Sequence, residues 1–375
     1  MEQFTSVIEQ GGQEPPNTEC TLIRYAPHVY LRQLQCRAVR LLAWLEAGSS
    51  ATNKERGMQD KYTFVPMTRE YLEPATELFI GSYKHEQEKS PLLPSRVIAE
   101  PEWIYDALEA RLVNPGVAVV EDNHLLAYMV TGLQFPWKGQ QAAFVPEFCH
   151  SAIEEQKREL YQRMYMHLSQ EWINHHIHLQ MIGHFAHDTI LQETLYQLGF
   201  GAILAERLRD CSALNQRHEV VIQEEKDVSK LLNIQIEHND YYAKAPIFIL
   251  KSTNPHEVLD ELETHVRQGD VFFVYYEQEE PCAYMIVGNS TIEGEGFLLQ
   301  NTNTAQIKSA YARPDIRRKG IGKALLQRVI EWSQAHGYER IFVEHETANF
   351  SGSIFWQKHF NPYIHFSMRY IDNTI

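Results

Sequence analysis

The sequence has few cysteines, and their spacing is not that of a metal or redox motif. Its 375 residues include five, which are Cys20, Cys36, Cys149, Cys211 and Cys282. The odd number and wide spacing argue against a disulfide framework and against a structural zinc site. No H-E-x-x-H pattern is present either, so we interpret the histidines between His175 and His187 as surface groups and expect no bound metal. We therefore predict a reducing, cytoplasmic location.

Long apolar runs and an excess of positive charge are also missing. No apolar stretch approaches the roughly 18 residues that a membrane helix needs, and the first residues lack the pattern of a secretory signal. The formal net charge of −15 argues against nonspecific nucleic-acid binding and mildly favours a cationic small molecule. We therefore expect neither a membrane nor a nucleic acid as a partner.

The chain is long enough for two domains of ordinary size, preceded by a segment of different composition. Residues 1–57 contain a polar, proline-containing stretch, a short helical pattern and the linker-like Gly48–Asn53. We interpret them either as an upstream extension, with Met58 as the natural start, or as a loosely packed helical arm. The two domains are then expected at residues 58–212 and 213–375.

These two domains show the same predicted order of elements, namely strand, helix, helix, three strands, helix, strand, helix and strand. In the first half the elements are expected at 62–66, 68–83, 101–112, 117–121, 125–133, 141–145, 154–175, 177–185, 188–198 and 202–208. In the second half they are expected at 220–223, 227–238, 255–268, 271–277, 282–288, 307–312, 323–336, 340–346, 350–359 and 364–371. The chain therefore contains an internal repeat, in which each repeated unit has the size of a domain.

A basic, glycine-containing loop joins a strand to a helix in the second half. Arg313–Leu326 reads Arg-Pro-Asp-Ile-Arg-Arg-Lys-Gly-Ile-Gly-Lys-Ala-Leu-Leu. Glycines let the backbone approach a phosphate, and the first N–H groups of a helix have no partner within it. A Walker A loop is excluded by Arg317 and Ala324, and a dinucleotide fingerprint is excluded by Leu325. The pattern that remains is R-x-x-G-x-G.

This pattern, at Arg317, Gly320 and Gly322, resembles the acetyl-CoA pyrophosphate loop of the GCN5-related N-acetyltransferases (GNAT). The segment Ala312-Arg-Pro314 before it fits the V-x-P of that family. The order of elements in both halves is also that of the acetyltransferase fold. The resemblance implies an α/β (α+β) protein with two tandem acetyltransferase-like domains, each a mixed twisted sheet flanked by helices.

The resemblance also implies a set of residues that bind acetyl-CoA as co-substrate. In the family the pantetheine arm lies between two parted strands, so Ser309 is expected beside it and an N–H of Tyr311 or Ala312 would polarise the thioester carbonyl. Asn349 lies where the family has a cofactor-contacting asparagine. The implied cofactor-binding residues are Ala310, Tyr311, Ala312, Arg317, Arg318, Lys319, Gly320, Ile321, Gly322, Lys323, Asn349 and Phe355.

The two halves depart from the family in opposite ways. At the corresponding place the first half has no glycine and no basic residue before Lys157, and it has acids at Glu147, Glu154 and Glu155. We interpret it as a degenerate structural half, in which Tyr196 of the family-like segment 195–200 is a core residue. The second half has Trp356 where the family usually has a tyrosine that protonates the CoA thiolate.

The catalytic candidates follow from the fifth strand and from nearby tyrosines. Glu344 and Glu346 alternate onto the same strand face, opposite His345, and we favour Glu346 as the base because it lies nearest Asn349. Glu293 and Glu295 are further candidate bases. Tyr311 and Tyr363 are the candidate acids.

Three functions fit these residues. The first is an N-acetyltransferase that moves an acetyl group from acetyl-CoA to a primary amine of a small molecule, with the C-terminal domain active. The second is a non-catalytic acyl-CoA-binding or regulatory protein, which Trp356 favours. The third is transfer of another acyl group, or transfer to a peptide terminus. A monomer or a homodimer is expected.

Overall fold

The elements form in the predicted order, and the first half contains additional strands. The computed structural model describes residues 62–137, 139–214, 220–290, 296–300 and 302–374. The predicted arm 1–57, the Met58 start and the candidate bases Glu293 and Glu295 lie outside these residues. No helix in the described ranges is long and apolar enough to cross a lipid bilayer.

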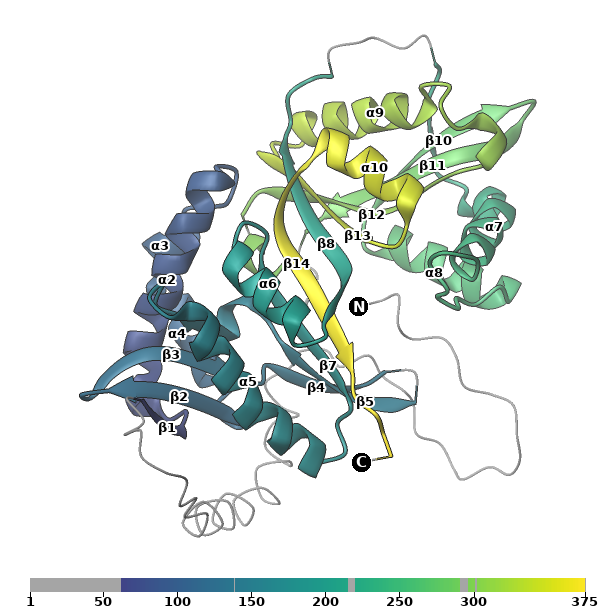
Figure 1. The fold of residues 1–375 in the computed structure, drawn as a ribbon. Helices are drawn as coiled ribbons and strands as arrows, with labels where there is room; N and C mark the ends of the chain where they lie inside the picture. Colours follow the sequence, from purple (N-terminus) through teal and green to yellow (C-terminus); the bar gives the residue numbers. More distant parts are fainter. Residues whose placement is uncertain (1–61, 138, 215–219, 291–295, 301, 375) are drawn as a thin grey trace. The chain divides into compact units, whose positions relative to one another are not determined.

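The first half runs from β1 to β8 (Figure 1). Its elements are β1 (Thr63–Pro66), α2 (Leu72–Lys89), α3 (Arg96–Ala99), α4 (Pro101–Glu109), β2 (Gly116–Glu121), β3 (His124–Val130), β4 (Leu133–Trp137), β5 (Gln140–Val145), β6 (His150–Ala152), α5 (Lys157–Asn174), β7 (Leu179–Phe185), α6 (Thr189–Gln197) and β8 (Gly201–Asp210). The prediction of a single strand at 125–133 is wrong, because β3 ends at Val130 and β4 begins at Leu133. There Gly132 lies against the ring of Pro146, where a Cβ would meet ring atoms at 2.3 Å.

The second half repeats this order with fewer strands. Its elements are β9 (Gln223–Glu225), α7 (Leu232–Tyr242), α8 (Pro255–Arg267), β10 (Val271–Glu277), β11 (Glu280–Asn289), β12 (Thr304–Ala312), α9 (Ile321–Ala335), β13 (Arg340–Glu346), α10 (Phe350–His359) and β14 (Asn361–Tyr370). The strand expected at 220–223 begins only at its last residue, because Gln223 is the first residue that pairs with β10.

The last strands of the two halves are exchanged. The large sheet has the order β4-β5-β7-β14-β8-β13-β12-β11-β10-β9, beside a second sheet β1-β2-β3-β6. β14 ends the second half but pairs with β7 of the first half, and β8 ends the first half but pairs with β13 of the second. In Figure 1 the yellow β14 runs beside the teal β8. The expected boundary at 212/213 therefore divides the sequence but not the sheet.

The helices of the second half cover opposite faces of its strands. One core contains Ile307 and Val343 of the sheet together with Leu325 of α9 and Trp356 of α10. The other core contains Tyr284 and Tyr311 of the sheet together with Ile234 of α7 and Val258 of α8. We call these two sides of the sheet the α9 face and the α7 face. Ile307 and Tyr311 of β12 point to different sides because the β11–β12 register shifts between Ile286 and Val287.

A row of histidines crosses the exchanged strands, of which His184 and His345 are buried and His365 is half-buried. The register aligns His345 of β13, Ala205 of β8, His365 of β14 and His184 of β7, so their side chains share one face. The Nε of Arg207 donates a hydrogen bond to Nε2 of His345 at 2.9 Å. Burial lowers the pKa of each of these three histidines to about 4. The imidazoles are therefore neutral near pH 7.

Candidate active site

The strands β12 and β13 part at the place where the acetyl-CoA arm is expected. They pair in parallel from Thr304↔Arg340 to Ile307↔Val343. Beyond this point the two strands no longer pair with each other. β12 stays paired only with β11, and β13 only with β8. We call the unpaired stretch, formed by residues 308–312 and 344–346, the β12–β13 fork. At the residues that were expected to line the pantetheine arm, the facing backbone edges of β12 and β13 are therefore not paired with each other.

The glycine-rich loop ends at the first turn of α9. Gly320 precedes this helix with φ +85°, a conformation that favours glycine. The first intrahelical bond is donated by Ala324 N to Gly320 O, so the earlier N–H groups of the helix have no intrahelical acceptor. A Cβ on Gly322 would meet the ring of Phe355 at 3.3 Å. The loop therefore has the backbone geometry of an anion site, and Gly322 allows Phe355 of α10 to pack against it.

Three of the basic residues of the loop, Arg317, Arg318 and Lys319, differ in their exposure. Arg318 and Lys319 are exposed, whereas Arg317 is half-buried. The Nε of Arg317 donates to the carbonyl oxygen of Ala312 at 2.9 Å. Its guanidinium carbon lies 4.9 Å from the ring centre of Tyr241. Arg317 thus holds the loop to the end of β12, and Arg318 and Lys319 present their charge to solvent.

On the α10 side, the Asn349 amide caps the helix and also contacts α7. Its Oδ1 accepts from Gly352 N at 3.2 Å and from the Tyr241 hydroxyl at 3.0 Å. Trp356 is buried in the α9-face core, 5.4 Å from the ring of Phe360. The place of the family's usual tyrosine is therefore taken by a packed indole.

Glu346 lies at the fork with one carboxylate oxygen unpartnered. Its side chain is 4% exposed, and Oε2 accepts a hydrogen bond from the Tyr242 hydroxyl at 2.8 Å. Oε1 is buried and has no hydrogen-bond partner among the described residues. Burial and the neighbouring carboxylate of Glu346 raise the pKa of Tyr242 well above its ordinary value, so Tyr242 keeps its proton. Glu346 can therefore accept a proton or a cationic donor at Oε1.

A polar network on the α7 face borders the fork. His238 Nδ1 lies 2.7 Å from the Tyr284 hydroxyl, which also contacts Gln235. The His238 ring stacks on Tyr311 with 4.8 Å between ring centres. Burial lowers the pKa of His238 well below its ordinary value and raises that of Tyr311.

Sequence reasoning missed His238 and Tyr242. The available signal is the spacing i, i+3, i+4 and i+7 along α7, which places polar residues on its buried face. These residues are Gln235, His238, Asn239 and Tyr242. Buried polar side chains in such a row require partners, and such partners often form a site.

The other two catalytic candidates lie on the same sheet face as Glu346. Glu344 is half-buried and aligns with Glu206 of β8. Tyr363 of β14 is buried and donates its hydroxyl to Glu206, which also accepts from Gly296 N. Because the Tyr363 hydroxyl is already donated, we assign it no role as an acid.

The first half has the same parting of strands, but its own side chains close it. β5 and β7 pair only from Ala142↔Leu179 to Val145↔Ile182, and β6 then pairs with β3. Across this β5–β7 fork, His150 Nε2 lies 2.7 Å from the carbonyl oxygen of Gly183. The other ring nitrogen, Nδ1, lies 2.9 Å from the Tyr161 hydroxyl. His150 therefore bridges the two parted strands of the first half.

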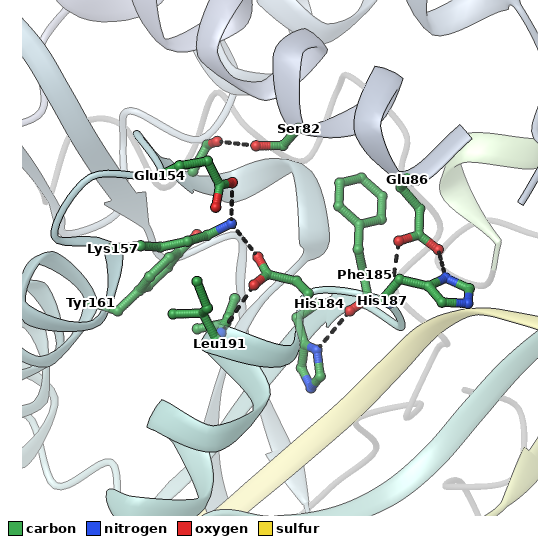
Figure 2. Close-up of polar contacts among 12 residues, drawn as sticks. Ser82, Glu86, Glu154, Lys157, Tyr161, His184, Phe185, His187 and Leu191 are labelled. Atoms are coloured by element: carbon green, nitrogen blue, oxygen red, sulfur yellow. Dashed lines mark hydrogen bonds and ion pairs between the residues drawn. The ribbon is translucent and has the colours of Figure 1, made fainter. Parts of the chain in front are cut away.

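The start of α5 is also satisfied internally. The Nζ of Lys157 lies 2.8 Å from Glu154 and 2.7 Å from Asp188, and Asp188 caps α6 through Leu191 N (Figure 2). Burial tends to lower the pKa of Lys157, but its two carboxylate partners raise it overall. These contacts leave no cationic group of this loop for a phosphate.

Tyr196 is not the core residue that we predicted. Its side chain is 79% exposed, while its neighbour Leu195 is 2% exposed. The helical rotation of about 100° per residue puts Leu195 under α6 and turns Tyr196 to solvent.

Comparisons with known proteins agree with this geometry. Residues 236–360 match the family described as Acetyltransferase (GNAT) family. Streptothricin acetyltransferase A of Bacillus subtilis (strain 168) is 28% identical over 107 residues. That match spans 28% of this chain and 59% of the length of that protein.

Solved structures are similar over a larger part of the chain. A GCN5-related N-acetyltransferase from Sphaerobacter thermophilus has a TM-score of 0.52 and 12% identity, covering 84% of this chain and 97% of its own. A tandem GNAT protein from the clavulanic acid biosynthesis pathway has a TM-score of 0.42 and 12% identity, covering 82% and 98%. The first of these similarities extends the acetyltransferase fold over both halves.

Proposed function

Because this chain belongs, through residues 236–360, to the Acetyltransferase (GNAT) family, we propose that it is an acetyl-CoA-dependent N-acetyltransferase. Its acceptor is a primary amine of a small molecule, and the C-terminal half carries the reaction. The acceptor identity, a cytoplasmic location and a monomeric or homodimeric state stay predictions.

One observation supports this proposal most strongly. The β12–β13 fork has the glycine-rich loop on its α9 face and the unpartnered Glu346 Oε1 on its α7 face. A cofactor and an amine could therefore approach the same opening from opposite sides. Arg318, Lys319 and the first N–H groups of α9 would hold the pyrophosphate.

The chain's own residues then handle the protons. Glu346 takes a proton from the acceptor ammonium through Oε1 and leaves the nitrogen lone pair free to attack. Tyr242 fixes the carboxylate by its hydrogen bond to Oε2. Acetyl-CoA supplies the acetyl group as a thioester, so formation of the amide releases the CoA thiol. Tyr311 is the proposed donor to the leaving thiolate, and the second proton, which the nitrogen loses as the amide forms, replaces the proton that Tyr311 gives up.

A second function is favoured by a specific residue. Trp356 is buried and offers no titratable proton near pH 7, so the usual thiolate-protonating group is missing at that place. A protein that binds acyl-CoA without turnover would show this combination of an open cofactor fork and an absent acid.

Thiol release separates the two functions. Purified protein is incubated with acetyl-CoA and a panel of small primary amines, and acetyl-CoA binding is measured in parallel by calorimetry. Turnover on a small amine supports the transferase, whereas tight binding without turnover on any amine supports the binding protein. Including other acyl-CoA thioesters and a peptide with a free N-terminus tests transfer of another acyl group and transfer to a peptide.

A further inference from the structure

We propose that the amine acceptor carries a carboxylate, and that Lys251 binds it while Glu346 binds the amine. The acceptor would then be an amino acid or a similar zwitterion. This inference rests on the proposed function, since it names the substrate class of the same site.

Hydrogen bonds to α7 position the segment that carries Lys251 beside the site. After α7 the backbone folds back, with Ile249 N donating to Tyr242 O at 2.8 Å. On the other side of Lys251, the carbonyl oxygen of Ser252 accepts from Asn239 Nδ2 at 2.7 Å. These two bonds anchor the backbone before and after Lys251 to α7.

The ammonium of Lys251 lies over the ring that contacts the proposed base. Its Nζ is 4.0 Å from the centre of the Tyr242 ring, and the Tyr242 hydroxyl donates to Glu346. In the described part of the chain, Lys251 donates no hydrogen bond and forms no ion pair. Burial lowers its pKa, and the nearby carboxylates of Glu346 and Glu261 oppose that shift.

The site therefore holds one cation and one anion that are near each other but not paired. Glu346 Oε1 is buried without a hydrogen-bond partner among the described residues, and the Lys251 ammonium lies over the Tyr242 ring. An unpaired charge that is buried, as at Glu346, is costly, and the neighbouring Lys251 is half-buried. A ligand with both an ammonium and a carboxylate would satisfy both groups, whereas a simple amine would leave Lys251 unpaired.

The nearest competing explanation is structural. Glu261 of α8 is exposed and close enough to influence the pKa of Lys251, although the two do not form an ion pair. If Lys251 only balanced this charge, then Glu261→Gln would disturb the site as much as a change of Lys251. The Glu261→Gln variant is therefore part of the test.

Matched substrate pairs provide the experiment. L-lysine is compared with cadaverine, and L-phenylalanine with phenethylamine, because the members of each pair differ by one carboxylate. The wild type is expected to use the amino acid with a higher kcat/KM than its decarboxylated partner. Lys251→Met should raise KM for the amino acids by about 10- to 100-fold, the loss expected for a hydrogen bond to a charged group. Its kcat, and its kcat/KM for the simple amines, should change little.

Two further variants serve as controls. Lys251→Arg keeps the charge and should retain the preference for the amino acids. Lys244→Met removes an exposed lysine from the same segment and should behave as the wild type. Because each variant is tested with both members of a pair, differences in amine basicity cancel.

Two results would overturn the inference. One is a wild type that uses cadaverine as well as L-lysine, and phenethylamine as well as L-phenylalanine. The other is an equal loss in Lys251→Met, Lys244→Met and Glu261→Gln. If acetyl-CoA binds but no amine turns over, the proposed function fails, and ligand-induced shifts in Tm decide this inference. Stabilisation of the wild type by the amino acids alone, lost in Lys251→Met, would then support it, and equal shifts with the simple amines would reject it.

Discussion

The His150 ring lies 2.7 Å from the carbonyl oxygen of Gly183, across two strands that have parted. The contact joins β6 to β7 through a side chain instead of backbone hydrogen bonds. At the equivalent β12–β13 fork, none of the hydrogen bonds found between described residues crosses in this way. One fold thus contains the same opening twice, once closed by an imidazole and once with a buried, half-satisfied carboxylate.

Glu346→Gln is expected to lower kcat without weakening acetyl-CoA binding. The amide preserves shape and can still accept from Tyr242, but it does not take a proton from an ammonium. Loss of a general base typically costs about 10²- to 10⁴-fold. Steady-state thiol release with parallel calorimetry measures both quantities, and Glu344→Gln is the matched control. A kcat within a few-fold of the wild type would remove Glu346 from the mechanism.

Changes in the glycine-rich loop should weaken acetyl-CoA binding by at least about 10-fold, the loss of one hydrogen bond to a charged group. In Gly322→Glu the new Cβ would meet the Phe355 ring at 3.3 Å, and a carboxylate would face the phosphates. The double variant Arg317→Glu, Arg318→Glu reverses two charges of the loop. Calorimetric titration with acetyl-CoA is the measurement.

A matched double charge reversal controls for the loss of net positive charge. Lys84→Glu, Lys226→Glu changes two exposed lysines away from the loop and should bind acetyl-CoA as the wild type does. Unchanged affinity in both loop variants would show that the phosphates bind elsewhere.

Stability should fall as the pH drops from about 6.5 to 4. Burial lowers the pKa of His150, His184, His345 and His365 to about 4. In the unfolded chain they titrate near 6.5. As the pH falls, protons therefore bind to the unfolded state before they bind to the folded state. Each histidine can lower the free energy of unfolding by up to about 1.4 kcal/mol per pH unit in this window. Above pH 6.5 this contribution to stability is fully present.

A buried carboxyl has the opposite effect in the same range. Burial raises the pKa of Glu147 to about 7, so protonation of the folded state adds stability as the pH falls toward 4.5. Burial also raises the pKa of Glu86, but the four histidines outnumber these two carboxyls, so the net free energy of unfolding should decrease. Urea unfolding at pH 7.5, 6 and 5 measures the slope, which His345→Asn should reduce. A stability that is flat or rising toward pH 5 would contradict the neutral state of these histidines.

The second half should not fold when it is produced alone. A fragment beginning at residue 213 keeps the whole acetyl-CoA loop but loses β8, which pairs with both β13 and β14. Unpaired strand edges in the middle of a sheet favour aggregation. We expect insolubility or loss of cooperative unfolding, with recovery when residues 58–212 are co-expressed. A soluble, cooperatively unfolding fragment would show that the exchange of β8 and β14 is dispensable.

Much of this protein follows from local sequence patterns. The order of strands and helices, the loop from Arg313 to Leu326 and the two exclusions that leave R-x-x-G-x-G all depend on residues near each other in the chain. The predicted common face of Glu344 and Glu346 is confirmed, because strand alternation is a local property. The sequence also shows directly that the first half lacks a basic, glycine-rich loop at the corresponding place.

Tertiary structure alone decided which strands exchange and which groups meet at the fork. A strand's sequence specifies its faces but not its neighbours, so the pairing of β14 with β7 depends on contacts between residues far apart in the chain. The exposure of Tyr196, the closure of the first fork by His150 and the placement of Lys251 over Tyr242 have the same origin. Each depends on packing between elements, because a local sequence pattern does not specify which distant side chain fills a given space.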